Sequence, residues 1–368
     1  MRAATMADIA RRAGVSRIAV SYALNGRPGV SADLRERILD IARELGYRAN
    51  GPALALHGAA ARAVGFVLLR SSAALTVEVF RRQLIAGIQA ELSGHGFALA
   101  LQMVTDLDEE TRVHRRWAAE RRVDGVLICD PRPDDPRIAA VRALRLPAAL
   151  IGVTPDERLP GAWCDDVPWS RELADHLAGL GHRHIARVSG PDGMLHTAVR
   201  DEALRTAAGA HGVRTTIVRG DYTGESGARL TRQLLQDPRR PTAIVYDNDV
   251  MAIAGLGVAG ELGLTVPGDL SIVACEDSPL CQVVGPPLTV VRRDIAAYGA
   301  LATAQLFVAL EGTGGPPVQA RGGHLEIRRS TGPAPGTDRG DPLDPGLGTD
   351  RGDPLDSGPN GTGRQWRP

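Results

Sequence analysis

The first fifty residues restrict the fold of this chain most strongly, because they contain three short helix signals joined by tight turns. Thr5 opens a capping-box pattern, Thr-Met-Ala-Asp, whose hydroxyl and acid satisfy free amides at a helix start. That helix ends at Gly14, and Ser16 is placed to cap a second helix over residues 17–24. Ser31 caps a third helix with apolar residues at helical spacing. Two short helices joined by a turn of a few residues, followed by a third, predict a helix-turn-helix over residues 1–50.

The charge of this segment differs from that of the rest of the chain. Residues 1–50 carry nine arginines against five acids, a net charge of +4, whereas the whole chain has a net charge of zero. The remainder therefore carries −4. A basic head on an acidic body is typical of a protein that binds double-stranded DNA and has a second task elsewhere. Charge alone is equally consistent with an ordinary helical bundle that has a solvated basic face, and the turn signals decide between the two.

Length and composition indicate a soluble protein of several domains. A chain of 368 residues is too long for one ordinary core, and its 43% hydrophobic content is normal for a globular protein. No signal peptide and no uncharged stretch of membrane-spanning length is evident, so we expect a cytoplasmic protein without membrane contact. The cysteines show no metal-binding or disulfide spacing, which favours reduced thiols; they are Cys129, Cys164, Cys275 and Cys281.

From residue 63 the pattern changes to short apolar runs alternating with longer helical segments. Such alternation predicts parallel sheets covered by helices on both faces, here two α/β lobes within residues 63–331 with a break near residues 156–163. Ligands of such folds bind at the carboxyl ends of the strands, which places a small molecule in the cleft between the lobes. The expected strands are residues 64–69, 97–103, 125–129, 148–153, 184–188, 215–218, 242–246 and 270–275.

Two further segments flank this body. Residues 51–62 are rich in Ala and Leu and predict a hinge with one short helix, and residues 332–368 are dominated by Gly, Pro and Asp. In this tail, residues 336–344 recur verbatim as residues 348–356. Its composition predicts disorder. Adhesion through the Arg-Gly-Asp triplets and calcium binding through the aspartates are weaker interpretations than a tandem duplication.

Two motifs that suggest other chemistry are better explained by structure. The G-x-G-x-x-G match at residues 255–260 falls inside an expected helix, too far from its N-terminus to hold a phosphate. His182 and His184 have no partner at zinc-ligand spacing. No nucleophile elbow or Walker loop is present. We therefore expect no enzyme activity, no cofactor and no metal.

The chain resembles the lactose-repressor (LacI/GalR) family of bacterial transcription regulators from the head to about residue 330. In that family a helical headpiece and a hinge helix precede a two-lobed core like that of periplasmic binding proteins. The resemblance therefore implies an N-terminal all-α helix-turn-helix headpiece on an α/β core. The matching segments are DIARRAGVS (8–16), VSYALNG (20–26), GHRHIARVSGP (181–191), GDYTGESG (220–227), VPGDLSIVACED (266–277) and PPLTVV (286–291).

The resemblance assigns DNA-binding roles within the head and the hinge. It implies that Arg17, Ile18 and Tyr22 face the major groove, where an arginine can contact guanine through two hydrogen bonds. Ala19 adds apolar surface beside Ile18. Leu56 matches the hinge leucine that relatives wedge between base pairs in the minor groove. Short polar side chains suited to phosphate contacts, or equally to helix caps, are Thr5, Ser16, Ser21 and Asn25.

The resemblance also assigns an effector site. Arg200, Asn248 and Glu276 match residues that hold a small polar ligand in relatives, and we expect them to converge from three loops of the second lobe. Tyr222 matches an aromatic residue that covers the ligand. An acid together with an arginine suits vicinal hydroxyls, so we expect a neutral sugar. The chain departs from its relatives at Glu276, where aspartate is usual, and at Gly152, where many carry another ligand-binding acid.

Together these features predict a homodimeric regulator, most simply a repressor, that binds operator DNA and responds to a carbohydrate effector. A solute-binding protein with the same two lobes is the main alternative, and an enzyme a weaker one. The tail contains no heptad repeat, so we expect a dimer and no tetramer. Leu84, Ile88 and Leu280 are candidates for the dimer contact, with core packing as the other interpretation of each.

Overall fold

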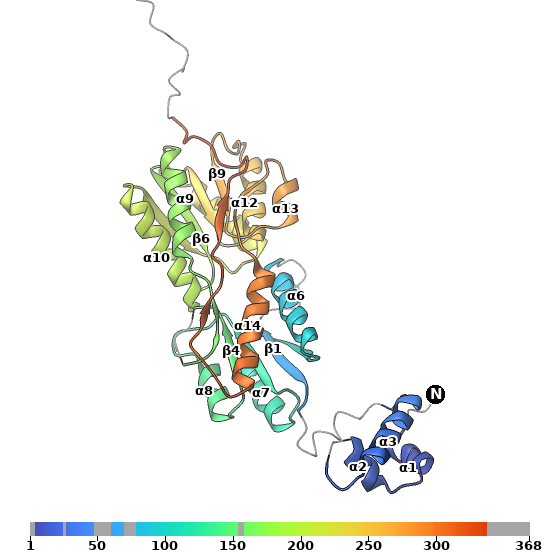
Figure 1. Ribbon diagram of the computed structural model, residues 1–368. Coiled ribbons are helices and arrows are strands. Elements are labelled where there is room, and N and C mark those ends of the chain that lie inside the picture. The colour runs from blue at the N-terminus through green and yellow to red at the C-terminus, as the bar shows by residue number, and fades with distance from the viewer. Residues whose placement is uncertain (1–3, 25–26, 48–59, 70–78, 154–157, 337–368) are drawn as a thin grey trace, which may run out of the picture. The chain divides into compact units, whose positions relative to one another are not determined.

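The computed structural model describes residues 4–24, 27–47, 60–69, 79–153, 158–336. Within these ranges the chain forms a helical headpiece and an α/β core of two lobes (Figure 1). This confirms the predicted fold class. The predicted hinge helix, Leu56, Asn25 and nearly all of the predicted tail lie outside the described residues. None of the described helices has the length and apolarity needed to cross a membrane.

The headpiece is built from three short helices, as the capping signals predict. Thr5 and the acid three residues on form the complete capping box, Gly14 ends the first helix with a φ of 67°, and the Ser16 hydroxyl accepts from the Ala19 amide at 3.1 Å. Ile9, Val20 and Ile38 are fully buried where the helices meet. The helices are α1 (Met6–Ala13), α2 (Arg17–Leu24) and α3 (Ala32–Glu44).

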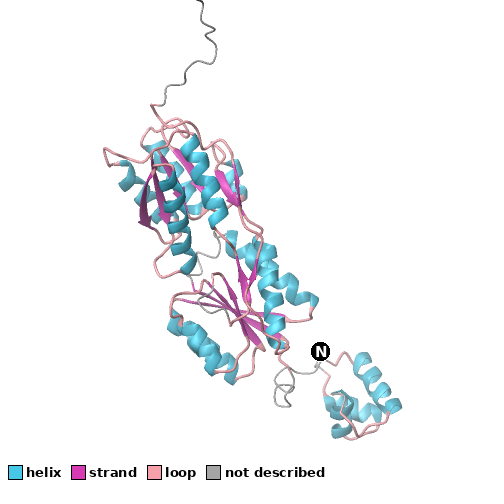
Figure 2. Ribbon diagram, turned by 60° about the vertical axis from the view of Figure 1, so that its left-hand side comes forward, coloured by secondary structure: helices cyan, strands magenta, loops and turns pink. Residues whose placement is uncertain are grey.

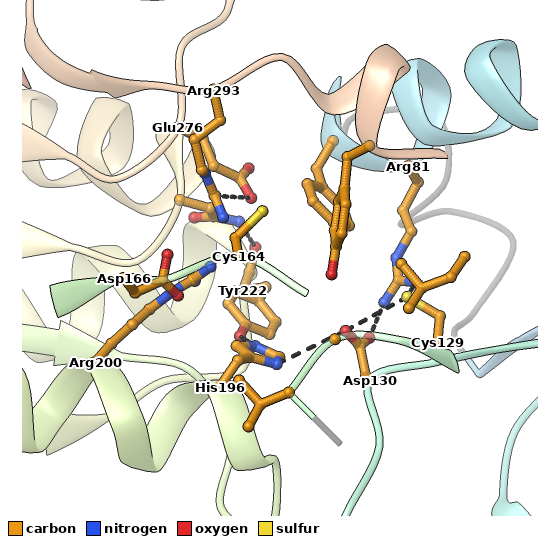
Figure 3. A pocket seen from close by; sticks show the side chains of 16 residues that line it. Arg81, Cys129, Asp130, Cys164, Asp166, His196, Arg200, Tyr222, Glu276 and Arg293 are labelled. Carbon is orange, nitrogen blue, oxygen red and sulfur yellow. Dashed lines mark hydrogen bonds and ion pairs between the residues drawn. The ribbon is translucent and has the colours of Figure 1, made fainter. Parts of the chain in front are cut away.

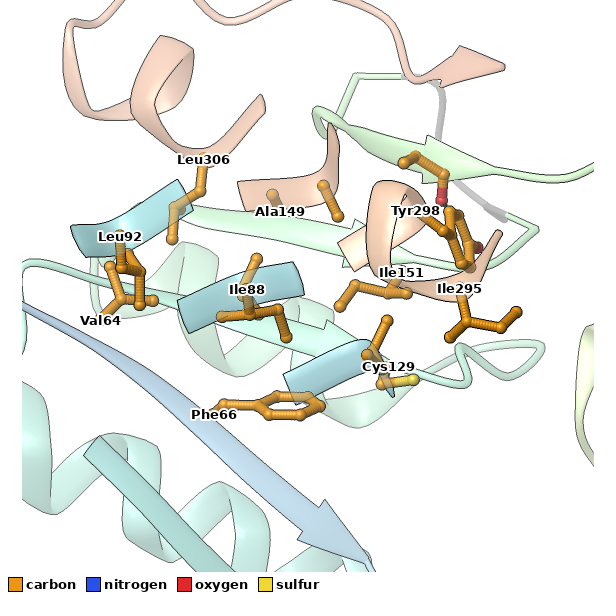
Figure 4. Close-up of a cluster of buried hydrophobic side chains, with 14 of the residues drawn as sticks. Val64, Phe66, Ile88, Leu92, Cys129, Ala149, Ile151, Ile295, Tyr298 and Leu306 are labelled. Carbon is orange, nitrogen blue, oxygen red and sulfur yellow. Dashed lines mark hydrogen bonds between the residues drawn. The ribbon is translucent and has the colours of Figure 1, made fainter. Parts of the chain in front are cut away.

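The first lobe contains a six-stranded parallel sheet with strand order β11-β5-β4-β3-β1-β2. Helices cover both of its faces (Figure 2). Val64, Phe66 and Ile88 belong to the apolar cluster that joins the sheet to α6 and α14 (Figure 4). The elements are β1 (Ala63–Leu69), α6 (Val79–Gly94), β2 (Ala98–Val104), α7 (Leu107–Ala119), β3 (Gly125–Cys129), α8 (Pro136–Ala143), β4 (Ala148–Ile151), β5 (Gly161–Trp163), α14 (Ile295–Leu310) and β11 (Val318–Gln319).

The second lobe repeats this arrangement with strand order β12-β10-β9-β8-β6-β7, all parallel except β12. The glycine motif at residues 255–260 lies inside α12, and a Cβ on Gly255 would meet the Tyr246 hydroxyl, so close packing explains this glycine. The elements are α9 (Val167–Gly179), β6 (His184–Ser189), α10 (Leu195–Ala210), β7 (Arg214–Arg219), α11 (Gly224–Leu235), β8 (Ala243–Tyr246), α12 (Asp249–Glu261), β9 (Ser271–Ala274), α13 (Pro279–Val283), β10 (Thr289–Arg292) and β12 (His324–Glu326).

The path of the chain between the lobes corrects the sequence analysis. The predicted break near residues 156–163 is wrong, because β5 within that range belongs to the sheet of the first lobe. The chain crosses after β5, returns between β10 and α14, and crosses again between β11 and β12. Four short strands were not predicted, namely β5, β10, β11 and β12. Three crossings tie the lobes together more closely than a single linker would.

Two smaller expectations also change. Leu84 and Ile88 are fully buried in the first-lobe core, so neither contributes an exposed dimer surface, whereas Leu280 is 56% exposed. The packed chain also extends past residue 331. The Gly332 amide donates to the Ser271 hydroxyl at 3.1 Å, and the Ala334 amide donates to the Leu180 carbonyl at 2.8 Å.

Candidate functional site

The second helix of the headpiece exposes the residues predicted to contact DNA bases. Ile18 is 66% exposed and Tyr22 36% exposed, although both are large side chains that usually prefer burial. Arg17 is exposed beside them and has no hydrogen-bond or ion-pair partner among the described residues. Val20 and Ala23, on the opposite face of α2, are buried against the other helices. The helix therefore presents a cation, an aliphatic and an aromatic side chain on one accessible face.

A pocket of about 700 Å³ lies between the two lobes, within the size range of small-molecule sites. It lies at the carboxyl ends of strands from both sheets, as predicted for parallel α/β lobes (Figure 3). Phe80 and Tyr298 from the first lobe and Tyr222 from the second give it aromatic surface. Its charged and titratable side chains are Arg81, Asp130, Asp166, His196, Arg200, Glu276 and Arg293.

Arg200 lines this pocket, but it projects from helix α10 and not from a loop as predicted. Its Nε donates to Asp166 at 2.6 Å and its Nη1 donates to Asp247 at 3.2 Å, and the residue is 7% exposed. Asp166 also accepts from the Trp169 indole at 2.8 Å. Since Asp166 lies just after the first crossing between the lobes, Arg200 joins the pocket wall to that crossing.

Asp247 is the centre of a buried network behind the pocket. It accepts from Arg187 at 2.7 Å, from the Gly190 amide at 3.1 Å and from the Tyr222 hydroxyl at 3.2 Å. Burial raises the pKa of this carboxyl, but the charges of Arg187 and Arg200 outweigh burial and lower it well below its usual range. Asp247 therefore stays ionised and fixes the two arginines and the tyrosine in place.

Asn248 and Tyr222 meet at the same wall of the pocket. The Asn248 side chain caps α12 by accepting from the Met251 amide at 2.9 Å, and its Nδ2 donates to the Tyr222 carbonyl at 3.0 Å. Tyr222 has a φ of 70°, an unusual backbone conformation for an aromatic residue. The amide group of Asn248 thus positions the tyrosine backbone as well as the helix.

Glu276 reaches the pocket from the loop after β9, as predicted. Its Oε1 lies 3.7 Å from Arg293, a residue that follows β10 and also donates to the Cys275 carbonyl at 3.2 Å. The Phe80 ring lies beneath this arginine, with the guanidinium carbon 5.9 Å from the ring centroid. Arg200, Asn248, Tyr222 and Glu276 are therefore brought together around one pocket.

Several pocket residues were missed by sequence reasoning. The missed charged and titratable ones are Arg81, Asp130, Asp166, His196 and Arg293. Asp130 and Arg293 directly follow strands β3 and β10, so their position at strand ends was a usable signal. The first-lobe helix α6 gave no comparable signal for Phe80 and Arg81. Within the described residues no group of His, Cys, Asp and Glu side chains forms a metal site.

Comparisons with known proteins agree with this architecture. Residues 5–50 match the model for bacterial regulatory proteins of the lacI family, and residues 174–331 match a periplasmic binding protein-like domain. The chain is 31% identical over 339 residues to the HTH-type transcriptional regulator AglR of Rhizobium meliloti (strain 1021), covering 89% of this chain and 94% of AglR. It is 30% identical to the HTH-type transcriptional regulator CelR of Thermobifida fusca, covering 89% and 98%.

Solved structures give the same result. A lac repressor dimer bound to operator and the anti-inducer ONPF has a TM-score of 0.77 and 26% identity, covering 90% of this chain and all of that chain. A CelR–cellobiose complex has a TM-score of 0.68 and 28% identity, covering 89% and 99%. The headpiece and pocket together define a ligand-responsive DNA-binding regulator. The chain belongs to the LacI family of bacterial transcription regulators, a family of regulators and not of enzymes.

Proposed function

We propose that this regulator is a homodimeric repressor whose operator affinity is set by a neutral sugar bound between the lobes. The observation that carries this proposal is the balance of charge in the pocket. Three arginines and three carboxylates line it, with aromatic side chains between them. A neutral ligand rich in hydroxyls uses such paired groups as donors and acceptors without leaving a charge uncompensated.

The DNA side of the proposal rests on the exposed face of α2. Arg17 contacts guanine, Ile18 and Ala19 provide apolar contact, and Tyr22 lies beside them in the major groove. Ser16 and Thr5, which cap helices here, place their amides and hydroxyls near phosphates. The same assignment gives Ser21 and Asn25 phosphate contacts and gives Leu56 the minor-groove wedge.

Sugar binding is tested by calorimetry with D-glucose, D-galactose, maltose, cellobiose and glucose 6-phosphate. The lac repressor and CelR structures were solved with an anti-inducer and with cellobiose respectively, which supports a carbohydrate panel. We expect one neutral sugar to bind and Glu276→Gln and Arg200→Ala to weaken it. Arg200→Ala should also abolish the effect of that sugar on DNA binding. Binding of glucose 6-phosphate alone would contradict a neutral effector.

Operator binding is tested by fluorescence anisotropy with labelled duplexes from the intergenic regions that flank the gene of this protein. We expect one duplex with a pseudo-palindromic site, hereafter the operator duplex, to bind far more tightly than a scrambled duplex of equal length. The bound sugar is then expected to change that affinity, typically by a coupling of about 1–3 kcal/mol. Equal affinity for every duplex would contradict a sequence-specific regulator.

The homodimer is supported by apolar side chains exposed in both lobes. Leu101 and Met103 on edge strand β2 are each 42% exposed, and Leu280 and Val283 on α13 are 56% and 77% exposed. Exposed apolar groups of this size are typical of association surfaces. Light scattering should give a dimer mass for the full chain and for a chain lacking residues 337–368. A tetramer that becomes a dimer on truncation would overturn this assignment.

A further inference from the structure

The end of strand β4 cannot supply the first-lobe carboxylate that many relatives carry there. Gly152 has a φ of 135°, a conformation that is essentially restricted to glycine. A Cβ atom at this position would lie 2.7 Å from the Cδ of Pro131, closer than side-chain carbons approach. Any acid at residue 152 would therefore require both a different backbone and a displaced proline. The first lobe must provide its acceptor from another element.

Asp130, on the neighbouring strand end, occupies the adjacent place. Its amide donates to the Ile151 carbonyl at 3.1 Å, so it lies directly beside Gly152 at the rim of the pocket. Its φ of 54° is uncommon for a side chain other than glycine or asparagine, and this conformation is held from both sides. Arg81 pairs with the carboxylate, and Arg137 donates to the Asp130 carbonyl at 2.9 Å.

The residue that holds this backbone is itself fixed. Arg137 is 2% exposed and forms ion pairs with Asp135 at 2.7 Å and with Glu110 at 3.2 Å. Its Nη1 also donates to the Cys129 carbonyl at 3.0 Å. The buried arginine thus fixes two consecutive carbonyls at the end of β3. Asp130 is presented to the pocket by a rigid support, as a ligand-binding group requires.

His196 faces Asp130 from the second lobe (Figure 3). Its Nδ1 lies 3.8 Å from Asp130 Oδ1, and its Nε2 lies 3.0 Å from the Tyr222 hydroxyl oxygen. Because that hydroxyl donates to Asp247, its oxygen accepts from His196, so the neutral imidazole carries its proton on Nε2. Nδ1 is then an acceptor. Two acceptors from opposite lobes face each other across the pocket rim.

We propose that Asp130 and His196 form a closing pair that binds hydroxyl groups of the effector from opposite lobes. This inference rests on the proposed function and deepens it. A vicinal diol supplies two donors, one for the carboxylate and one for the imidazole Nδ1, and so removes the conflict between two facing acceptors. The pair selects ligands with a free diol at this end of the pocket, and lobe closure around the ligand depends on it.

The protonation state of His196 supports this arrangement. Burial and the charge of Arg200 lower the pKa of His196, while the carboxylates of Asp130, Asp247 and Asp166 act in the opposite direction. The imidazole is therefore neutral near pH 7, and its Nδ1 accepts. The groups that face it are Asp130 from the end of β3, Arg200 from its own helix, Tyr222 after β7, Asp247 after β8 and Asp166 at the first crossing.

The first test compares Asp130→Asn with Asp134→Asn in the full chain. Asparagine tolerates the positive φ of residue 130, so the backbone conformation is kept while the charged acceptor is lost. Asp134 is a matched control, because it lies in the same segment, has a φ of 50°, and is exposed outside the pocket. Calorimetry with the four neutral sugars named above is expected to show binding weakened about tenfold or more in Asp130→Asn and unchanged in Asp134→Asn. Equal affinity of wild type and Asp130→Asn overturns the proposal and leaves the proposed function intact.

The second test needs no ligand. In histidine-labelled protein, nitrogen NMR is expected to show the Nε2–H tautomer for His196, and Asp130→Asn is expected to lower the pKa of His196 because a carboxylate that raises it is removed. An Nδ1–H tautomer or an unchanged titration overturns the closing pair, whatever the sugars do. If the titration moves but no sugar binds to wild type, the pair stands and the proposed effector class is wrong.

Discussion

The arginines of the headpiece and of the pocket lie in opposite surroundings. Arg17 is exposed on α2 and has no partner among the described residues, whereas Arg200 is 7% exposed and contacts two carboxylates. A DNA-binding surface has to keep its cations available, since the phosphates and base edges are themselves the partners. A pocket for a neutral ligand has to neutralise its cations within the protein and use their geometry.

The same difference extends to how the two regions are held together. The exposed pairs of the headpiece, such as Arg12 with Glu44 at 2.7 Å, are in water and are screened by salt. Arg187 behind the pocket is fully buried between Asp201 and Asp247. Buried pairs are screened far less, but each depends strongly on its partner. The two regions should therefore respond differently to salt, to mutation and to pH.

The largest expected effect is that of salt on DNA binding. With six to ten phosphates contacted, affinity for the operator duplex should fall roughly 10³–10⁵-fold between 50 and 200 mM salt. Binding of the sugar should change by less than about twofold, because a neutral ligand releases no counterions. Anisotropy and calorimetry across the same salt series measure both. A sugar affinity that falls as steeply as the DNA affinity would contradict the contrast between exposed and paired charges.

The next largest effect concerns the buried network behind the pocket. Arg187→Leu leaves Asp201 and Asp247 without their shared cation, and breaking a buried pair in this way typically costs about 3–5 kcal/mol of unfolding free energy. Urea unfolding of the full chain at a fixed concentration measures this. The matched control is Arg232→Leu, whose ion pair with Glu261 is exposed; it should cost about 0.2–1 kcal/mol. Similar losses in both variants would contradict the structural role of the network.

The contrast between the regions also explains what the sequence could predict. The bounds of α1 and α2 follow from local signals, since Thr5, Gly14 and Ser16 each act within a few residues of the helix end that they cap. The exposed DNA-contact face then follows from helical periodicity. Local chemistry is sufficient where a function depends on a surface helix and its caps.

The pocket depends on distant residues, and the sequence predicted it less completely. The partners of Arg200 are Asp166 and Asp247, which lie 34 and 47 positions away. The crossings between the lobes depend on β5 and β11, strands of three and two residues that are too short to show a period. The resemblance identified four pocket residues, but which charges neutralise each other is fixed only by packing.

The third prediction concerns pH and a buried histidine of the first lobe. His114 is fully buried, neither ring nitrogen has a hydrogen-bond partner, and burial lowers its pKa to about 4. Its unfolded pKa is near 6.5, so its contribution to stability is complete above that pH and is lost as pH falls toward 4. His114→Leu removes this loss. The stability of the variant relative to wild type should rise by about 2 kcal/mol between pH 8 and pH 5.

Glu110, one helical turn before His114, has the opposite dependence. Burial raises its pKa to about 7 against the attraction of Arg137, so its contribution is lost as pH rises from about 4.5 to 7. In wild type the two groups therefore partly cancel, and His114→Leu should make the core more stable at mildly acidic pH. His211→Leu, at an exposed histidine, is the control for urea unfolding at both pH values. Parallel pH profiles for wild type and His114→Leu would show that His114 does not titrate in this window.

The smallest expected effect separates base readout from general attraction in the headpiece. Arg17→Ala should cost about 1–3 kcal/mol of binding to the operator duplex and little on a scrambled duplex, because only the operator offers the matching base edge. Unfolding free energy should stay within about 0.5 kcal/mol of wild type, since Arg17 is exposed and has no partner among the described residues. Arg27→Ala, at another exposed headpiece arginine outside the three helices, is the comparison for a non-specific loss of charge. If Arg17→Ala weakens both duplexes equally, as expected for Arg27→Ala, then Arg17 contacts phosphate and the sequence is read by other residues of α2.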